Sequence, residues 1–444
     1  MLDQETNELL TKVGPGTPMG ELMRRYWQPI AAVGEFDGET TTKPVRLMGE
    51  ELVLYKDLSG NYGLIDRHCC HRSADLSYGF VEKCGLRCNY HGWLYGHDGK
   101  CLEMPYEDTV APNSGFRESI AIKAYPVEEK RGLLWAYLGP EPKPLVPNWE
   151  PFTWANGFVQ IVFAEIPCNW FQCQENSIDP VHFEWMHENW RLRLRGDTNG
   201  YAPSHLKVGF DEFDYGFVYR RIREGGSEDD PLWKVGRVCL WPNALFTGGH
   251  FEWRVPVDDE TTLSVTWVFS RVPKDREPYV QNSIPHWTGP IKDSETGRWI
   301  DSHVMNQDFI AWVGQGAVTD RTREHLGQSD KGVVMVRRRF LDDLKRIEQG
   351  EDPKAVIRDP EINKCVELPI VTRKFLKEGL TREQIKEFGA RANVITPYLY
   401  VYQAGQPEHV RKAYEAATGI ELSRESFVED GARTPGTLLV NQAE

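Results

Sequence analysis

Short runs in which apolar and polar residues alternate dominate the chain from Lys43 onward. The runs PVRLM, ELVLY and YGLI are separated by turn residues, and LYG is joined to KCLEM through Asp98 and Gly99. Alternation with a period of two predicts half-buried β-strands, and Asp-Gly between two such runs predicts a tight hairpin. We therefore expect a small, antiparallel, all-β domain that ends with the strand GLLWAYLG.

Helix and boundary signals flank this β domain. Thr17 followed by Pro18 predicts the N-cap and first position of a short helix through Tyr26. After the last strand of the small domain, prolines recur at 140, 142, 144 and 147, which is typical of a stiff, extended segment. We divide the chain into a helical lead-in (residues 1–26), the β domain (27–146) and a larger domain (147–444).

The larger domain begins with longer strand patterns and becomes helical toward its end. A strand is expected at Phe158–Glu165, and others in GFVYRRI, LWKVGRVCLW and TLSVTWVFS. From Ser302 the pattern is helical, with the amphipathic run VVMVRRRFLDDLKRIEQG and a capping box between Thr381 and Gln384. Strands followed by helices predict an α+β fold with a large antiparallel sheet covered by helices, a helix-grip-like arrangement.

Size and charge exclude several kinds of partner. A chain of 444 residues is long enough for two domains, and 52 basic against 66 acidic residues give a net charge of −14. This charge repels nucleic acids and anionic membranes. No apolar run approaches the ~20 residues of a membrane span, and the start MLDQETNELL lacks the features of a secretory signal. We expect a cytoplasmic protein whose nine cysteines serve as thiols or metal ligands.

Two short pairs predict a metal cluster. Cys69 and His71 are followed, after sixteen intervening residues, by Cys88 and His91. Two thiolates and two imidazoles are the ligands of a Rieske [2Fe-2S] cluster, in which the cysteines hold one iron and the histidines the other. Structural zinc uses the same residue types. Each loop supplies one Cys and one His, which favours the two-iron cluster over zinc.

A second set of histidines predicts a mononuclear iron site. His182 and His187 follow Asp179, and two histidines with a carboxylate form the facial triad of non-haem iron enzymes. Residues five apart diverge by ~140° on a regular helix, so the helix must bend or bulge, and Pro180 supplies a cause. Two histidines packed on an ordinary helix are the alternative. The separate cluster motif favours the iron site.

Longer segments carry a family resemblance. The segment IDRHCCHRSADLSYGFVEKCGLRCNYHGWLYGHDGKCLEMP resembles the cluster-binding region of the Rieske non-haem iron aromatic-ring oxygenases, and GPGTPMGELMRRYWQPI resembles their phthalate dioxygenase-like branch. QENSIDPVHFEWMH matches the family's mononuclear iron signature. Cys70 stands where the family usually has proline, and we interpret it as a packed bystander, with a role in tuning the potential of the cluster as the alternative. Cys84 and Cys101 lie outside the motif and are interpreted as structural thiols.

The resemblance assigns further residues. It implies that Asp179, with Asn176 nearby, bridges two metal centres and that the third iron ligand is an Asp just before a later helical run. Asp308 fits this position best, with Asp301, Asp320 and Asp330 as competitors. Asp320 is more simply an ion-pair partner of Arg321, and Asp330 a helix cap. Each chain would hold one [2Fe-2S] cluster and one Fe(II), in a head-to-tail homo-oligomer that is usually a trimer.

Electrons and substrate must come from outside the chain. No flavin or nicotinamide fingerprint is present, so a separate reductase or ferredoxin is expected. Basic residues around the cluster loops would dock an acidic carrier or form an ordinary solvated face: Arg67, Arg72, Lys83 and Arg87. Aromatic residues of the larger domain suit an aromatic substrate, although most are expected in the core: Phe183, Trp185, Trp241, Phe246, Phe251, Trp253 and Trp312. The run Arg191-Leu-Arg193-Leu-Arg195 would bind a substrate carboxylate or form an interface strand.

These features favour the oxygenase component of a multicomponent system. We expect it to use O2 and supplied electrons to hydroxylate an aromatic compound, with O- or N-dealkylation as the leading reaction because no cluster of basic residues marks a dianion site. Ring cis-dihydroxylation of a phthalate-like acid is the main alternative. A Rieske electron carrier or a zinc-stabilised binding module is disfavoured by the length and the second pair of histidines.

Overall fold

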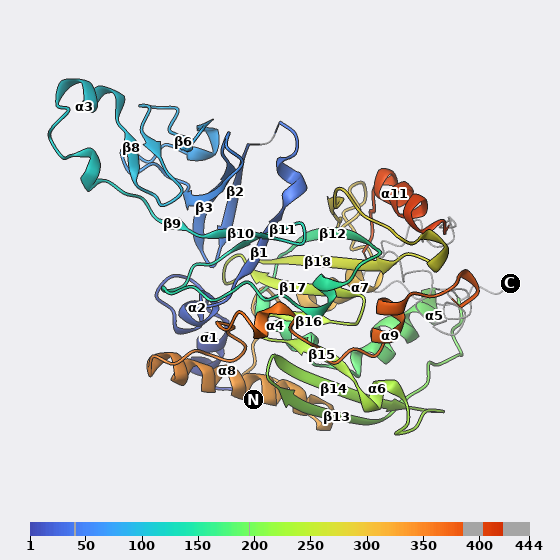
Figure 1. Cartoon of the computed structure of the whole chain (residues 1–444). Helices are drawn as coiled ribbons and strands as arrows, with labels where there is room; N and C mark the ends of the chain where they lie inside the picture. The colour runs from blue at the N-terminus through green and yellow to red at the C-terminus, as the bar shows by residue number, and fades with distance from the viewer. Residues whose placement is uncertain (40, 195, 385–402, 421–444) are drawn as a thin grey trace.

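The protein consists of a β-rich lobe attached to a larger body (Figure 1). The structure is a computed structural model that describes residues 1–39, 41–194, 196–384 and 403–420. The lobe projects from one end of the molecule, and the body is built around one large sheet. The expected α+β fold is confirmed.

The lobe contains two small antiparallel sheets. The first has the order β2 (Thr42–Leu47), β3 (Glu50–Lys56), β4 (Tyr62–Asp66) and β9 (Ala124–Tyr125). The second has the order β5 (Phe80–Glu82), β6 (Gly85–Arg87), β7 (Leu94–Tyr95) and β8 (Cys101–Glu103), and helix α3 (Pro105–Val110) lies beside it. The expected hairpin at Asp98-Gly99 joins β7 to β8.

A third sheet and two helices connect the lobe to the body. The sheet has the order β1 (Gln28–Ala32), β11 (Leu133–Ala136) and β10 (Val127–Lys130). Helix α1 (Gln4–Thr11) precedes α2 (Pro18–Met23), where the Thr17 hydroxyl accepts the Gly20 N–H at 3.2 Å. The predicted cap is confirmed, but α2 ends before Tyr26.

The body is organised around an eight-stranded sheet. Its order is β13 (His205–Phe213), β14 (Gly216–Arg223), β15 (Arg237–Leu240), β16 (Ala244–Phe246), β17 (His250–Pro256), β18 (Thr262–Arg271), β12 (Gly157–Ile166) and β19 (His286–Thr288). All neighbours are antiparallel except β12 and β19, so the expected antiparallel sheet is mixed at one edge. The predicted strand LWKVGRVCLW also begins as helix α6 (Pro231–Lys234), because proline suits a first helical position.

Helices cover the sheet and form much of the later part of the described chain. Helix α4 (Trp170–Asn176) is followed by a π-helix over Phe183–Asn189 that continues into α5 (Trp190–Leu194). The later helices are α7 (Val304–Gly314), α8 (Lys331–Glu348), α9 (Arg373–Glu378) and α11 (Glu408–Thr418). The predicted capping box is present, since the Thr381 hydroxyl accepts the Gln384 N–H at 3.2 Å and the Gln384 side chain accepts the Thr381 N–H at 2.9 Å.

The two faces of the large sheet differ in character. Strand β17 is buried along its whole length, yet its residues alternate between aromatic and polar. Trp253 packs edge-on against Trp135 of β11 with ring centroids 5.2 Å apart. On the opposite face, the Arg254 guanidinium lies 4.7 Å from the ring centre of Trp312 in α7. The face toward α4 and α7 is therefore buried and polar, and we call it the polar face.

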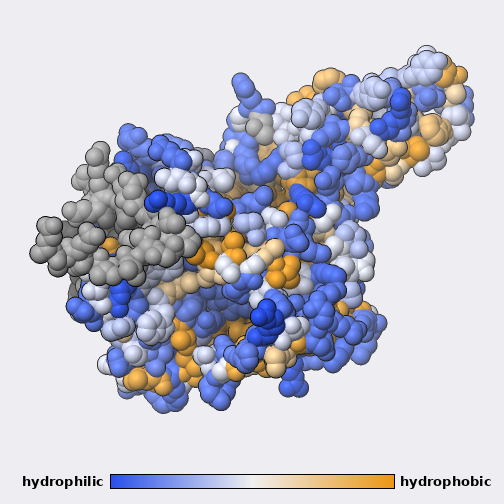
Figure 2. Space-filling view, turned by 180° about the vertical axis from the view of Figure 1, so that it is seen from behind, coloured by the Kyte–Doolittle hydropathy of each residue, from blue (hydrophilic) through white to orange (hydrophobic). Residues whose placement is uncertain are grey.

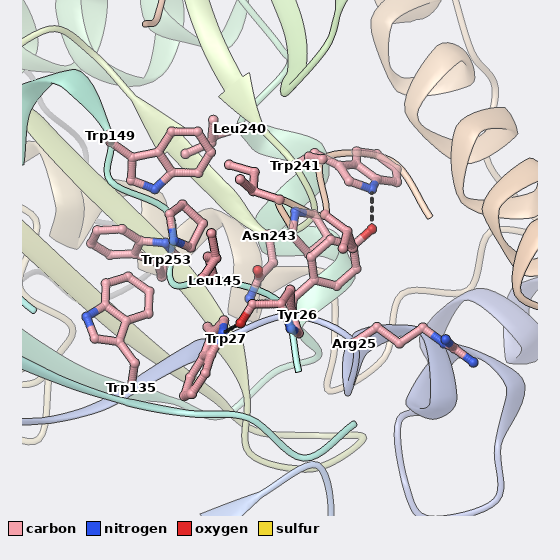
Figure 3. Close-up of a pocket in the computed structure, with 16 residues that line it drawn as sticks. Arg25, Tyr26, Trp27, Trp135, Leu145, Trp149, Leu240, Trp241, Asn243 and Trp253 are labelled. Carbon is pink, nitrogen blue, oxygen red and sulfur yellow. Dashed lines mark hydrogen bonds between the residues drawn. The ribbon is translucent and has the colours of Figure 1, made fainter. Parts of the chain in front are cut away.

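Most of the aromatic residues considered for the substrate lie in the core, as expected. One hydrophobic cluster, which also contains residues of β1 and β11, buries four of them: Trp241, Phe246, Phe251 and Trp253. Figure 3 shows Trp241 and Trp253 around a small cavity near Tyr26, whose hydroxyl accepts the Trp241 indole N–H at 3.1 Å. The cavity has a volume of ≈ 40 Å³. This holds a water or two but no aromatic ring.

Candidate functional site

The first site is formed by two loops of the lobe. Cys69 and His71 follow β4, and Cys88 and His91 lie between β6 and β7. The loops are closed by backbone bonds, in which the Cys69 N–H donates to Ala74 at 2.9 Å and the Cys88 N–H to Trp93 at 2.8 Å. The rings of His71 and His91 lie 4.4 Å apart. The structure thus brings together the two pairs that the sequence singled out.

The chemistry of these four side chains fits an iron–sulfur cluster. Both cysteines are 2% exposed, so they offer two buried sulfur ligands. Burial and the neighbouring His91 lower the pKa of His71, so its ring is neutral and able to bind a metal. The buried Nδ1 of His71 has no hydrogen-bond partner among the residues that the structure describes. A metal ion bound to this nitrogen removes the free-energy cost of leaving it unpaired.

The other cysteines of the lobe have different environments. Cys70 is exposed, so the prediction of a packed bystander is wrong. Its Sγ lies 3.3 Å from the Tyr95 hydroxyl, which also lies 3.1 Å from Cys69 Sγ. Cys101 is buried, as expected for a structural thiol, whereas Cys84 is exposed.

The second site depends on the π-helix. Its hydrogen bonds join residues five apart, as in the bond from the Trp190 N–H to the Trp185 carbonyl. A turn of this width brings His182 and His187 to one side, with ring centroids 5.3 Å apart. The expected bulge is therefore a π-helix. Pro180 does not bend it but lies before its start, between α4 and His182.

Helix α7 supplies a carboxylate to the two histidines. Asp308 Oδ1 lies 3.7 Å from His182 Nε2 and 3.5 Å from His187 Nε2. Potential ligand atoms of the three residues all lie within 4.8 Å of one another, the one such metal-ligating group found among the described residues. Two imidazole nitrogens and a carboxylate fit a mononuclear non-haem iron. Asp308 lies inside α7 rather than just before the helical run, which corrects the expected position.

Asp179 and Asn176 lie beside this triad. Asp179 Oδ2 is 3.5 Å from His182 Nδ1, and the Asp179 side chain remains 30% exposed. Although burial alone would raise the pKa of Asp179, its interaction with His182 holds it below the usual value. The Asn176 amide donates to Asp308 Oδ1 at 3.2 Å. Asp179 therefore contacts the outer nitrogen of one histidine while Asn176 orients the carboxylate.

The competing aspartates lie elsewhere. Asp320 is exposed and accepts bonds from Thr322, while Arg321 pairs with Glu175, so the expected Asp320–Arg321 ion pair is wrong. Asp330 occupies the N-cap position of α8, and its carboxylate accepts the Gly327 N–H. Asp301 is buried, but its backbone carbonyl, not its carboxylate, accepts from Gln307.

Gln307 is a residue that sequence reasoning missed. Its Oε1 lies 3.0 Å from His187 Nδ1, and its Nε2 donates to the Asp301 carbonyl at 2.9 Å. The donated bond identifies Oε1 as the free acceptor, so His187 Nδ1 carries the proton and Nε2 is left to bind a metal. The signal in the sequence was its position next to Asp308.

The basic residues that the sequence singled out lie in different environments. Arg67 pairs with Asp75, and Arg87 with Glu82 and Glu103, whereas Arg72 and Lys83 are exposed. The arginine run after the His pair continues the π-helix into α5, so the interface-strand interpretation is wrong. Arg193 donates to the carbonyls of Asp197 and Gly200, Arg191 is buried, and Arg195 lies outside the described residues.

The two sites together define an oxygenase that joins an electron-storing cluster to an O2-activating iron. A family model described as Rieske [2Fe-2S] domain matches residues 26–126, and one described as LigXa C-terminal domain like matches residues 294–370. The chain is 59% identical to the 5,5'-dehydrodivanillate O-demethylase oxygenase subunit of Sphingobium sp. strain SYK-6, over 97% of this chain and all of the relative. The chain belongs to the Rieske non-haem iron oxygenases.

More distant proteins support the same family and fold. The chain is 30% identical to the phthalate 4,5-dioxygenase oxygenase subunit of Pseudomonas putida, over 79% of this chain and 88% of the relative. The solved structure of NdmA from Pseudomonas putida CBB5 shares the fold with a TM-score of 0.54 at 22% identity, covering 75% of this chain and 94% of that one. The protein is therefore an oxidoreductase with one [2Fe-2S] cluster and one mononuclear iron, and the zinc-module and simple electron-carrier alternatives are set aside.

No helix in the described ranges is both long and apolar enough to cross a membrane.

We expect Gln307→Leu to weaken iron binding at the second site about 10–100-fold, because His187 loses the acceptor that orients its ring. Iron would be titrated into apoprotein in which the cluster is intact. The matched control is Gln315→Leu, since Gln315 lies just after the same helix and donates to a carbonyl of α7. Equal iron affinity in the two variants would show that Gln307 does not hold His187.

Proposed function

We propose that this protein is the terminal oxygenase of an O-demethylase that acts on an aromatic methoxy acid. The observation that carries the proposal is the 59% identity, over nearly the whole of both chains, to a subunit named for O-demethylation of 5,5'-dehydrodivanillate. That compound joins two vanillate units, each an aromatic carboxylic acid with a methoxy group.

We propose that Cys69, His71, Cys88 and His91 hold the cluster, and that His182, His187 and Asp308 hold the mononuclear iron. When bound, this iron activates O2 with electrons that arrive through the cluster. In the overall reaction, the bond between the methyl carbon and the aryl oxygen breaks, giving a phenol, formaldehyde and water. One O2, two electrons and two protons are consumed.

The protein's own residues prepare this chemistry. Gln307 sets the tautomer of His187, and Asn176 donates to Asp308, so both ligands are oriented before a metal binds. Asp308 and His187 are buried, which keeps water away from them. Asp179 contacts His182 from the exposed side of the site.

We also propose that the working form is a head-to-tail homotrimer. In one chain the sheet β5–β8 lies at the far end of the lobe, away from α4 and α7 (Figure 1). Apolar side chains gather on this projecting lobe (Figure 2), and its exposed aromatic residues are Tyr78, Phe80, Tyr90, Tyr106 and Phe116. An exposed apolar patch favours contact with another protein, and a second copy would bring its cluster loops to Asp179.

The electron donor would be a separate ferredoxin or reductase. Arg72 and Lys83 are the exposed cations of the four predicted around the cluster loops, and they suit an acidic carrier. A solved neighbour of this fold is a complex of the oxygenase and ferredoxin of carbazole 1,9a-dioxygenase, with a TM-score of 0.51. The nine cysteines form no disulfide, which fits a reducing cytoplasm.

The reaction is tested with 5,5'-dehydrodivanillate, a reductase and ¹⁸O2. O-demethylation should release formaldehyde in proportion to substrate consumed and leave the new phenol without ¹⁸O, because the aryl oxygen is retained. Ring dihydroxylation, suggested by relatives named as dioxygenases, would put two ¹⁸O atoms into the product. A doubly labelled diol without formaldehyde would replace the demethylase proposal.

Asp308→Ala should lose the mononuclear iron and oxygenation while the cluster spectrum is kept, because the triad loses its carboxylate. Iron content, acid-labile sulfide and EPR of the reduced protein would be measured. Asp320→Ala is the control, since Asp320 is exposed and bonds only locally to Thr322. Loss of iron in the Asp320 variant and not in the Asp308 variant would reverse the assignment.

Asp179→Asn should keep both metal centres but slow turnover at least tenfold, because the contact with His182 loses its charge. Single-turnover reduction of the iron by a pre-reduced cluster is the decisive measurement. If electron transfer and coupled turnover stay near normal, Asp179 serves only to hold the turn before the π-helix through the Val181 N–H.

A further inference from the structure

Arg221 is a buried arginine that the iron chemistry does not use. It lies on β14, on the polar face of the large sheet, and is 4% exposed. Its Nε and Nη1 atoms are buried and have no hydrogen-bond partner among the residues that the structure describes. A guanidinium offers five N–H donors, and leaving charged donors unpaired in the interior is costly. The position therefore calls for an acceptor.

Arg221 lies one aromatic ring from the iron ligands. Its guanidinium carbon is 4.3 Å from the ring centre of Phe183. The ring of Phe183 in turn lies 5.3 Å from the ring of His187. A methoxybenzoate carries its carboxylate and its methoxy group at different positions of one ring. A cation that lies one aromatic ring away from the iron ligands therefore suits an aromatic acid.

The acids nearest to Arg221 are already bonded to other groups. Glu188 is paired with Arg223, whose guanidinium also donates to the Pro203 carbonyl. Glu184 accepts bonds from both the backbone and the ring of His205, at 2.7 and 2.8 Å. Burial and the neighbouring Arg237 lower the pKa of Arg221 to about 9, so an anion bound here would be strongly favoured over water.

The other buried arginine of this face differs in one respect. Arg254 is buried too, and its Nε and Nη1 also have no partner among the described residues, but its Nη2 donates to Glu252 at 2.7 Å, and Glu252 is bonded in turn to His250. Arg254 therefore has its counter-ion within the fold. The cation–π contact of Arg221 with Phe183 stabilises its charge without satisfying its N–H groups.

We propose that Arg221 binds the carboxylate of the substrate and so selects aromatic acids over neutral aromatic ethers. The proposal rests on the proposed function for its choice of substrate. A carboxylate meets a guanidinium through two parallel N–H···O bonds, which fixes the position of the acid as well as its charge. Arg221 is thus a specificity-determining residue that holds the ring while the methoxy group faces the iron.

The test measures binding to the iron-loaded, full-length enzyme and needs no turnover. The probes are biphenyl-3,3'-dicarboxylate, which has the biphenyl frame and carboxylates of dehydrodivanillate without its methoxy and hydroxyl groups, and its neutral diamide. We expect wild-type enzyme to bind the diacid at least tenfold more tightly than the diamide. Arg221→Gln should weaken diacid binding about 10–100-fold and leave diamide binding nearly unchanged. Arg221→Lys should fall between the two.

Two further readouts separate binding from structure. Removing an unpaired buried charge should leave the thermal midpoint unchanged or raise it, whereas Arg223→Gln should lower it because Glu188 is left unpaired. The Arg223 variant should keep the wild-type ratio of diacid to diamide affinity. Equal diacid affinity in wild type and Arg221→Gln, or equal binding of the two probes by wild type, would overturn the proposal.

The binding test and the formaldehyde assay together keep the two proposals distinguishable. If wild type releases formaldehyde from dehydrodivanillate but binds diacid and diamide equally, the demethylase function stands and Arg221 is structural. If wild type prefers the diacid through Arg221 but releases no formaldehyde, the carboxylate site stands and the demethylase function fails.

Discussion

The width of the turn between His182 and His187 is the constraint on which the iron site depends. In an α-helix their rings would point apart, and Asp308 could face only one of them. The π-helix brings both rings to Asp308. It also sets the directions of the side chains between His182 and His187 and of those that follow His187. A π-helix is rare and appears mostly at functional sites, so it needs support from its surroundings. That support comes from bonds of its side chains to the chain that follows: Glu184 with His205, Glu188 with Arg223, and Asn189 with the Ala202 N–H.

The large sheet can hold such a site because its two buried faces differ in composition. The face toward the lobe is aromatic and fills the core, with Trp253 and Trp267 among its members. The polar face carries His250, Glu252 and Arg254 on the same strand. Burying polar groups is costly unless they are bonded to one another or to a ligand. The polar face is therefore stable only where such partners exist. This requirement restricts the position of the site, as the metal ligands also do.

The sequence was most informative about features that depend on the spacing of residues close together in the chain. The two Cys/His pairs, the His pair and the strands of the lobe were all predictable, because loops of fixed length and alternating residues act over a few positions. Gln307 and Arg221 were not, since their meaning comes from His187 and Phe183, which are distant in the chain or on another element. The partner of an expected core residue is equally hidden from the sequence: the Trp241 indole donates to the Tyr26 hydroxyl, 215 positions away.

Net charge adds a reason for recognition to be local. A chain with a charge of −14 repels an anionic substrate at long range, yet this repulsion is screened beyond about 8 Å at physiological ionic strength. Inside the fold, water no longer screens charges, so one cation acts strongly over a short distance. Two of the basic residues around the cluster loops are occupied, Arg67 by Asp75 and Arg87 by Glu82. An acidic protein can accept an aromatic acid through a single unpaired positive charge that is buried near the iron ligands.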